Sequence, residues 1–301
     1  MLRRASLLPL LGSATLAAAG GVIGAAWYVT TRVSPQHPRH YSDRYIFTPW
    51  ELGVPFEEIT LRSADGLALT GWWLPRPESR GVVVGSHGHS GSKDDLLGIG
   101  TSAWRAGFNV LLFDYRGRGD SEPWPHSLVS REVDDLLAAV AYARARVDGA
   151  KIGVVGFSMG AAVAIMAAAR EPAIAALVAD SSFTAVADVV AHGVRRTLGI
   201  PPAPLVRAAD EVLARRHGYR FTRARPIDAV GAISPRPILI AHGGGDTTVP
   251  VEQARRLFAA AGAPKELYLV DGVEHCGAYF ADRPGYCARV NAFFAHHLSE
   301  C

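Results

Sequence analysis

The chain is poor in the residues that build metal centres and disulfide frameworks. It has three cysteines among 301 residues, with neither a CxxC pair nor a ladder of cysteines and histidines. We therefore expect no zinc site and no other metal. Pairing of Cys276 with Cys287 stays open beside the alternative of two free thiols, because spacing alone does not show whether two Cα atoms come within bridging distance.

Clusters of one charge sign are missing as well. The net charge is +3 and the 31 lysines and arginines are spread along the sequence, so we expect no nucleic-acid partner. No G-x-x-x-x-G-K-[ST] or well-spaced G-x-G-x-x-G sequence is present, which argues against a nucleotide-binding loop. With 49% hydrophobic and 20% charged residues, the composition is typical of a folded protein with a large core.

One long stretch without charge distinguishes the start of the chain. Residues 5–31 contain no charged side chain, and Leu7 to Val29 is long enough to cross a bilayer as a helix, which takes about 20 apolar residues. Trp27 would then lie at one membrane interface, where amphipathic rings are enriched. We therefore expect residues 1–31 to form a single-pass membrane anchor.

A cleaved signal peptide is the alternative for this segment, since Ala17 to Ala19 form a small-residue cleavage pattern. Arg3 and Arg4 lie closer to the apolar stretch than the arginines on its other side, which predicts that the large domain lies outside the cytoplasm. Residues 32–54 contain several prolines and are expected to be a linker, and residues 55–301 are expected to form the folded domain.

The folded domain alternates short apolar runs with helical patterns. The first two runs flank a turn at Asp65-Gly66 and predict an antiparallel hairpin. The later runs are almost continuously apolar, which suits strands buried on both faces. The eight runs are residues 57–62, 67–74, 81–86, 109–114, 151–156, 174–180, 237–242 and 266–271. This alternation predicts an α/β fold with a mostly parallel sheet and helices on both faces.

One connection is too long for an ordinary loop. Residues 184–236 contain no strand-like run, and we expect them to form a small helical lid. They hold nine arginines and four acidic residues, so their net charge is +5. A solvated helical face is one interpretation of this charge, and contact with anionic lipid headgroups or acidic substrates is the other.

Ser158 lies in the only G-x-S-x-G sequence of the chain, between the run at 151–156 and an alanine-rich helical stretch. A serine on a tight strand-to-helix turn has its hydroxyl exposed above the sheet, and glycines on either side avoid collisions with neighbouring backbone. The following helix adds the positive end of its dipole beside the reacting oxygen. We therefore predict that Ser158 is a nucleophile.

A serine nucleophile needs a base, and the base needs a carboxylate that orients its ring. His275 is the candidate base, because it follows the last predicted strand at the same edge of a parallel sheet as Ser158. Asp246 in HGGGDTTVP is the candidate acid, and Asp180, at the end of an earlier strand, is its rival. The chain order Ser, Asp, His is typical of the hydrolase variant of the triad.

Acyl transfer also needs hydrogen-bond donors for the oxygen that becomes negative. The backbone N–H of Met159, directly after the nucleophile, is one predicted donor. The backbone N–H of His89 is the other, because the glycine-rich loop SHGHSG bends sharply after the run at 81–86.

Five motifs occur in a familiar order: SHGHSGSK, FDYRGRGDSE, GFSMG, HGGGDTTVP and GVEHC. Together they resemble the α/β-hydrolase superfamily, particularly its membrane-anchored serine hydrolases near the serine aminopeptidase and monoglyceride-lipase branch. The resemblance covers about residues 55–298. It implies an α/β-hydrolase fold, a triad of Ser158, Asp246 and His275, and the two oxyanion donors named above.

The residues and the resemblance predict a two-step acyl transfer that requires no metal or organic cofactor. We expect small-molecule carboxylic esters or thioesters as substrates, since a lid and a membrane anchor suit apolar acyl chains. A serine peptidase or amidase of the same fold is an alternative. A catalytically silent, membrane-tethered binding protein is another, because a fold alone does not decide function.

Overall fold

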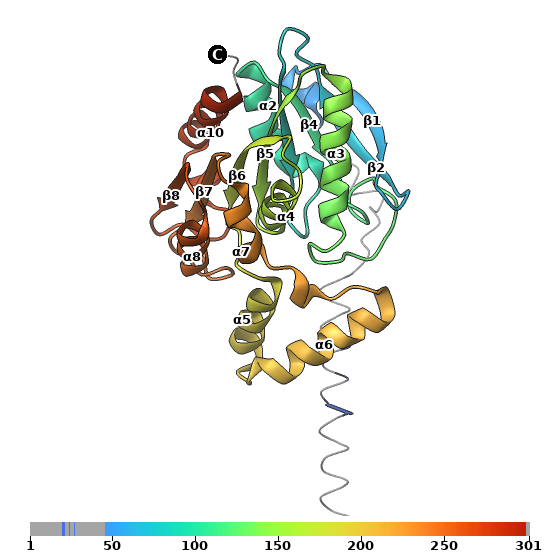
Figure 1. Cartoon of the computed structure of the whole chain (residues 1–301), viewed down its shortest axis with the longest axis vertical. Helices are drawn as coiled ribbons and strands as arrows, with labels where there is room; N and C mark the ends of the chain where they lie inside the picture. Colours follow the sequence, from blue (N-terminus) through green and yellow to red (C-terminus); the bar gives the residue numbers. More distant parts are fainter. Residues whose placement is uncertain (1–19, 22–23, 25–26, 28–45, 299–301) are drawn as a thin grey trace, which may run out of the picture.

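A computed structural model describes residues 20, 21, 24, 27 and 46–298 of the chain. Most of the predicted anchor or signal peptide (1–31) and of the predicted linker (32–54) lies outside these residues. Within the described part, no helix is both long enough and apolar enough to cross a bilayer. Figure 1 shows a central sheet flanked by helices, with a helical insertion projecting from one end.

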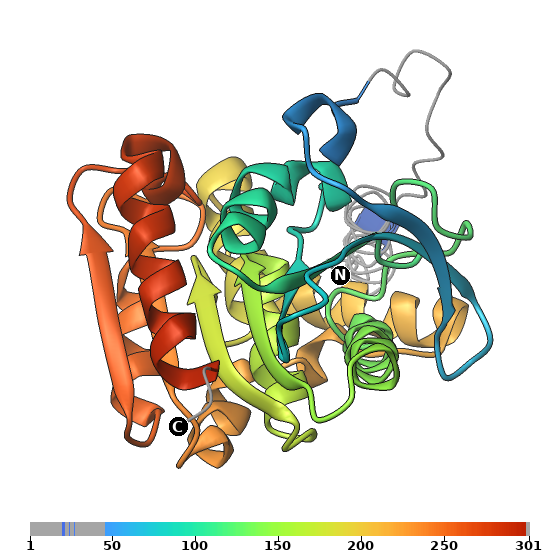
Figure 2. The same ribbon diagram turned by 90° about the horizontal axis from the view of Figure 1, so that it is seen from above.

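The sheet has eight strands in the order β1-β2-β4-β3-β5-β6-β7-β8. The β1–β2 and β2–β4 pairs are antiparallel and all other pairs are parallel, which confirms the predicted hairpin and mostly parallel sheet. Figure 2 shows the twist, with the curved β1–β2 hairpin and β8 at opposite edges. The strands are β1 Glu57–Arg62, β2 Ala68–Leu74, β3 Gly81–Ser86, β4 Asn109–Phe113, β5 Lys151–Phe157, β6 Ile174–Asp180, β7 Ile238–Gly243 and β8 Lys265–Val270.

The hydrophobic core consists of two clusters, one on each face of the sheet. One joins the strands to α3 (Glu132–Arg146), α4 (Met159–Ala168) and α8 (Glu252–Ala260). The other joins them to α2 (Leu97–Arg105) and α10 (Arg283–Leu298). Side chains alternate between the two faces of a strand, so a strand buried on both faces contributes residues to both clusters. This explains why the buried strands have continuous apolar sequences.

The predicted insertion at 184–236 is helical. It comprises α5 Val186–Leu198, α6 Pro202–His217, η4 Phe221–Arg223, α7 Pro226–Ala229 and η5 Val230–Ile233. Gly199 and Gly218 end α5 and α6 in left-handed conformations, at φ 67° and 72°, which glycine adopts without steric cost. Leu205 and Leu213 of α6 are buried in the cluster that contains α3 and α4.

Candidate active site

Ser158 lies on a sharp turn between β5 and α4. Its φ of 53° is unusual for a residue other than glycine, and its N–H donates to the backbone oxygen of Asp180 at 2.8 Å. A Cβ at Gly156 would lie 2.6 Å from the oxygen of Gly160, and a Cβ at Gly160 would lie 2.1 Å from the oxygen of Ser86. Both flanking positions therefore require glycine, and the turn presents the serine side chain above the sheet.

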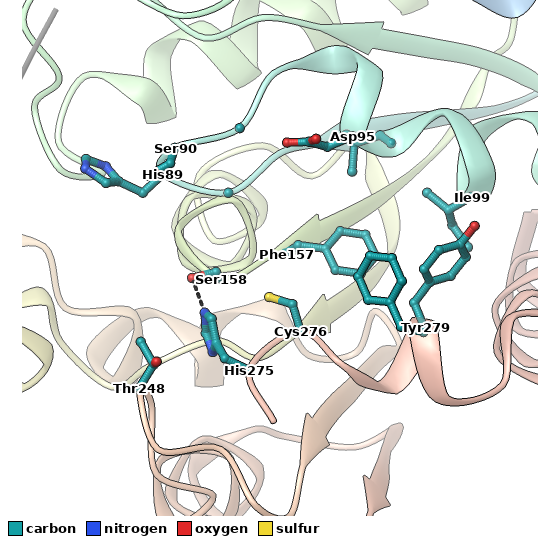
Figure 3. Close-up of a pocket in the computed structure, with 14 residues that line it drawn as sticks. His89, Ser90, Asp95, Ile99, Phe157, Ser158, Thr248, His275, Cys276 and Tyr279 are labelled. Carbon is teal, nitrogen blue, oxygen red and sulfur yellow. Dashed lines mark hydrogen bonds between the residues drawn. The ribbon is translucent and has the colours of Figure 1, made fainter. Parts of the chain in front are cut away.

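The structure brings the three predicted triad side chains together. His275 Nε2 lies 2.8 Å from Ser158 Oγ, the contact drawn in Figure 3, and His275 Nδ1 lies 2.6 Å from Asp246 Oδ2. Ser158 follows β5, Asp246 follows β7 and His275 follows β8, so the parallel strands deliver all three to one edge. The contacts form a continuous path for a proton from the hydroxyl to the imidazole.

Asp246 is buried and surrounded by donors. Its Oδ1 accepts the N–H groups of Thr248 at 2.9 Å and Val249 at 2.7 Å. Burial raises the pKa of Asp246, but hydrogen bonds from His242 and His275 outweigh burial and hold this pKa well below its usual range. The carboxylate is therefore ionised at neutral pH, and it favours the tautomer of His275 with a proton on Nδ1.

His242, at the end of β7, is a buried neighbour of Asp246. Its Nε2 lies 2.8 Å from the backbone oxygen of Val249 and 3.3 Å from Asp246 Oδ2. Burial lowers the pKa of His242, but the contact with Asp246 reverses the shift and raises it. The only sequence signal for this contact is the spacing of the histidine and aspartate in HGGGD.

The predicted oxyanion donors belong to two separate segments of the chain. Met159 is the first residue of α4, so its N–H has no acceptor within the helix. His89 belongs to the loop after β3, and its ring points away from Ser158 in Figure 3, with its centroid 5.1 Å from that of His126. The His89 ring is thus turned away from Ser158, and the His89 N–H remains the predicted donor.

Comparison with known proteins supports the same fold. The family model described as alpha/beta hydrolase fold matches residues 81–225. An uncharacterized protein of Mycobacterium tuberculosis, Rv2307c, is 32% identical over 224 residues, which are 72% of each chain. The chain belongs to the α/β-hydrolase family. Another relative is the uncharacterized protein YqkD of Bacillus subtilis, with 29% identity over 238 residues and 78% of each chain covered.

Solved structures show the α/β-hydrolase fold over most of the chain. An esterase of Pyrococcus furiosus, Pf2001, superposes with a TM-score of 0.72 at 24% identity, covering 88% of this chain and 97% of the esterase. A hypothetical protein from Pseudomonas aeruginosa superposes with a TM-score of 0.67 at 20% identity, covering 87% of this chain and 99% of its own. At these identities the likeness concerns the fold alone.

Asp180, the rival acid, is engaged elsewhere in this α/β-hydrolase fold. Its carboxylate accepts hydrogen bonds from the hydroxyls of Tyr286 at 2.7 Å and Ser181 at 2.8 Å. Burial raises its pKa. Ser181 Oγ also accepts the N–H of Cys276 at 3.1 Å, and both residues have left-handed backbones, with φ of 54° and 55°. Asp180 therefore holds the backbone next to His275 and does not contact the imidazole ring directly.

His87, a neutral and buried histidine, supports the loop that contains His89. His87 is fully buried, which lowers its pKa. Its Nδ1 lies 2.7 Å from the oxygen of Gly88, and its Nε2 accepts the N–H of Tyr115 at 3.1 Å. This pattern fits a ring with one proton, on Nδ1, and it ties the loop after β3 to the loop after β4.

The motif FDYRGRGDSE forms buried ion pairs and contributes no residue to the cavity beside Ser158. Lys93 Nζ lies 2.6 Å from Asp114 Oδ2, and the side chains of both are almost inaccessible. Arg116 bridges Asp135 at 2.6 Å and Asp65 at 2.8 Å. Loss of one partner from such a pair leaves a buried charge uncompensated, so the motif is structural.

A cavity of about 500 Å³ opens beside Ser158. It is lined by Gly88, His89, Ser90, Gly91, Asp95, Leu96, Ile99, Phe157, Ser158, Thr248, His275, Cys276, Tyr279 and Phe280. No residue of the insertion at 184–236 is among them, so the predicted lid does not cover this cavity in the described structure. The insertion instead borders the loop after β7 that contains Asp246. There His192 and Arg196 contact the backbone oxygen of Thr247 at 3.0 and 2.7 Å.

The two described cysteines, Cys276 and Cys287, are free, so the disulfide considered from the sequence is absent. The side chain of Cys276 lines the cavity, and burial raises the pKa of its thiol. A thiol held in its neutral form is a weak nucleophile, because the thiolate is the reactive species. Ser158, with a base in contact, is the better candidate for covalent chemistry.

Proposed function

We propose that the protein is a serine hydrolase that cleaves carboxylic ester or thioester bonds through an acyl-enzyme intermediate. The observation that carries the proposal is the pair of short contacts from His275 to Ser158 and to Asp246. As Ser158 Oγ attacks the carbonyl carbon, His275 Nε2 takes the hydroxyl proton. The N–H groups of Met159 and His89 stabilise the negative oxygen of the tetrahedral intermediate.

Collapse of this intermediate breaks the bond to the alcohol or thiol, which leaves with the proton from His275. Water then attacks the acyl-enzyme, again losing a proton to His275, and the second collapse frees the acid and restores Ser158. Asp246 stays ionised throughout and stabilises the imidazolium that forms at each stage. These residues complete the cycle without a cofactor.

The cavity favours esters over peptides, because aliphatic and aromatic side chains form much of its wall. The fold shared with the Pyrococcus furiosus esterase agrees with this preference. A serine peptidase or amidase would use the same triad, and a silent binding protein would keep the fold without the chemistry. Substrate tests on the whole chain separate these alternatives.

The direct test uses a fluorophosphonate probe, which reacts covalently with activated serines. We expect the full-length protein to be labelled and the variant Ser158→Ala to remain unlabelled with an unchanged circular dichroism spectrum. Failure to label the folded wild type would support a binding protein. Among labelled outcomes, faster turnover of aminoacyl amides than of acyl esters would support the peptidase alternative.

We further propose that residues 1–31 anchor the hydrolase domain at a membrane, with the domain outside the cytoplasm, as in the membrane-anchored serine hydrolases that the motifs resemble. The uncharged stretch at 5–31 supports this placement. Alkaline carbonate should leave the full-length protein in the membrane fraction. N-terminal sequencing distinguishes this anchor from a cleaved signal peptide, whose loss would give a new amino terminus after Ala19.

A further inference from the structure

The cavity beside Ser158 has two unlike sides, which Figure 3 separates. The side that we name the apolar arm is formed by Leu96, Ile99, Phe157, Tyr279 and Phe280. The opposite side carries His89, Ser90 and Thr248. An ester has one substituent on each side of its reacting carbonyl, so these two sides would receive chemically different halves of the substrate.

Tyr279 is held at the apolar arm by a close fit to α2. A Cβ at Gly98 would lie only 1.9 Å from the Tyr279 hydroxyl oxygen, so the absence of a side chain at Gly98 is what admits the phenol. The Tyr279 ring also packs edge-on against Phe280 and Tyr286, with centroids 5.2 and 5.8 Å away. The ring is therefore in contact with three neighbours, Gly98, Phe280 and Tyr286.

We propose that the apolar arm binds the acyl chain of the ester and that Tyr279 limits the length of chain that the arm accepts. The inference rests on the proposed function, because it needs an ester carbonyl at Ser158. An apolar chain buried among Leu96, Ile99 and Phe157 loses contact with water, whereas the alcohol half faces polar groups. The substrate class is thus a simple ester with a linear, uncharged acyl chain.

The exposed carboxylate of Asp95 also lies at the cavity, and its charge selects against anionic acyl chains only. It accepts the N–H of Ser92 at 3.3 Å, and its negative charge disfavours acyl chains that end in a carboxylate. The same charge would favour an ammonium group, which makes aminoacyl esters the informative competitor. A preference for aminoacyl esters over uncharged acyl esters of equal length would overturn the proposal.

The experiment measures kcat/KM on p-nitrophenyl esters of increasing acyl length. For the wild type we expect about a fourfold rise with each methylene that enters the arm, followed by a decline once the arm is filled. Tyr279→Ala should move the maximum to longer chains by at least two carbons. The matched control Tyr279→Phe keeps the ring, so its maximum should stay with that of the wild type.

The variant Gly98→Ala tests the position of the Tyr279 ring in a second way. Its new methyl group must displace the Tyr279 phenol, so the variant should shift the chain-length maximum in the wild-type background but not in combination with Tyr279→Ala. An unchanged maximum in both Tyr279→Ala and Gly98→Ala would overturn the role of Tyr279. If the variants changed selectivity for the alcohol chain in place of the acyl chain, the assignment of the arm would be wrong.

Fluorophosphonate labelling separates failure of this proposal from failure of the hydrolase proposal. Labelled variants with an unchanged chain-length profile contradict only the role of Tyr279. A folded wild type that is not labelled removes the proposed function and this inference together. Should Tyr279→Ala fail to fold, Tyr279→Leu retains apolar volume and shortens the side chain, and it is expected to give the same direction of shift.

Discussion

The edge of the sheet that carries Ser158, Asp246 and His275 differs from the helical insertion in how its polar groups are paired. Around Ser158, Asp180 and Asp246, buried polar groups form hydrogen bonds, several of which join segments that are far apart in sequence. In the insertion, ion pairs such as Arg225 with Asp228 are exposed and local in sequence. Buried bonds fix atomic positions, whereas exposed pairs contribute little. Substitutions should therefore matter far more at the edge than in the insertion.

The largest effect is expected from Ser158→Ala. Loss of the nucleophile should lower kcat/KM on a preferred ester by at least about 10⁴-fold, leaving the fold intact. The matched control is Ser182→Ala, since the Ser182 hydroxyl is buried and has no hydrogen-bond partner among the described residues. Comparable losses in the two serine variants would mean that the decline reflects damage to the fold and not loss of chemistry.

The two carboxylates at the edge should differ strongly in activity. Asp246→Asn presents an amide to His275 and disfavours its productive tautomer, so we expect kcat/KM to fall on the order of 10³ to 10⁴-fold. Asp180→Asn still offers an acceptor to the Tyr286 or Ser181 hydroxyl, and its loss should stay below about tenfold. Steady-state kinetics on one ester compare both variants directly. A larger effect at Asp180 would reverse the assignment of the acid.

The same carboxylates should affect stability with opposite dependence on pH. The folded pKa of Asp246 lies below its unfolded value of about 3.9, so its stabilisation is present above that pH and is lost as the pH falls toward the folded pKa. The folded pKa of Asp180 is raised by burial, so its ionisation destabilises the folded state, and this penalty disappears as the pH falls through the folded pKa.

Urea unfolding of the wild type, Asp246→Asn and Asp180→Asn between pH 3 and pH 7 tests these signs. As the pH falls, the wild type should lose its stability advantage over Asp246→Asn. Over the same range it should gain stability relative to Asp180→Asn. Two difference curves that slope in the same direction would contradict the environments described for the two carboxylates.

The smallest effect on activity is expected from breaking the contact between the insertion and the loop that contains Asp246. Arg196→Ala removes one hydrogen bond to the backbone of Thr247, so kcat/KM should fall by no more than about tenfold. Arg225→Ala is the matched control, because its partner Asp228 lies on the exposed surface of the same insertion, and no change is expected. A loss for Arg196→Ala as large as that for Asp246→Asn would give the insertion a direct part in the chemistry.

Much of the fold was predictable, because parallel strands buried on both faces require continuous apolar runs. All eight predicted runs became strands, with ends that agree within one residue. The convergence of Ser158, Asp246 and His275 follows from the same rule, since the carboxyl ends of parallel strands share an edge. Their catalytic roles remain proposals, which the labelling and kinetic experiments test.

The parts that the sequence did not reveal depend on packing between distant elements. Nothing periodic in the chain shows that Tyr286, 106 residues after Asp180, supplies its hydroxyl partner. The contact of His242 with Asp246 depends on the turn after β7, and the cavity wall depends on how α9 (Ala278–Ala281) meets α2. The helices at 184–236 were predicted as a lid but do not line the cavity beside Ser158. A helical sequence pattern does not specify where the helices pack.

The tight turn at Ser158 also limits how this stretch can vary. Carbonyl oxygens stand where any side chain at 156 or 160 would have to go, so a library randomised across 156–160 and selected for folded protein should return glycine at both ends. Variety would be confined to the three central positions. Replacing the oxygen at position 158 by sulfur would therefore disturb this turn far less than moving the reactive side chain to a neighbouring position.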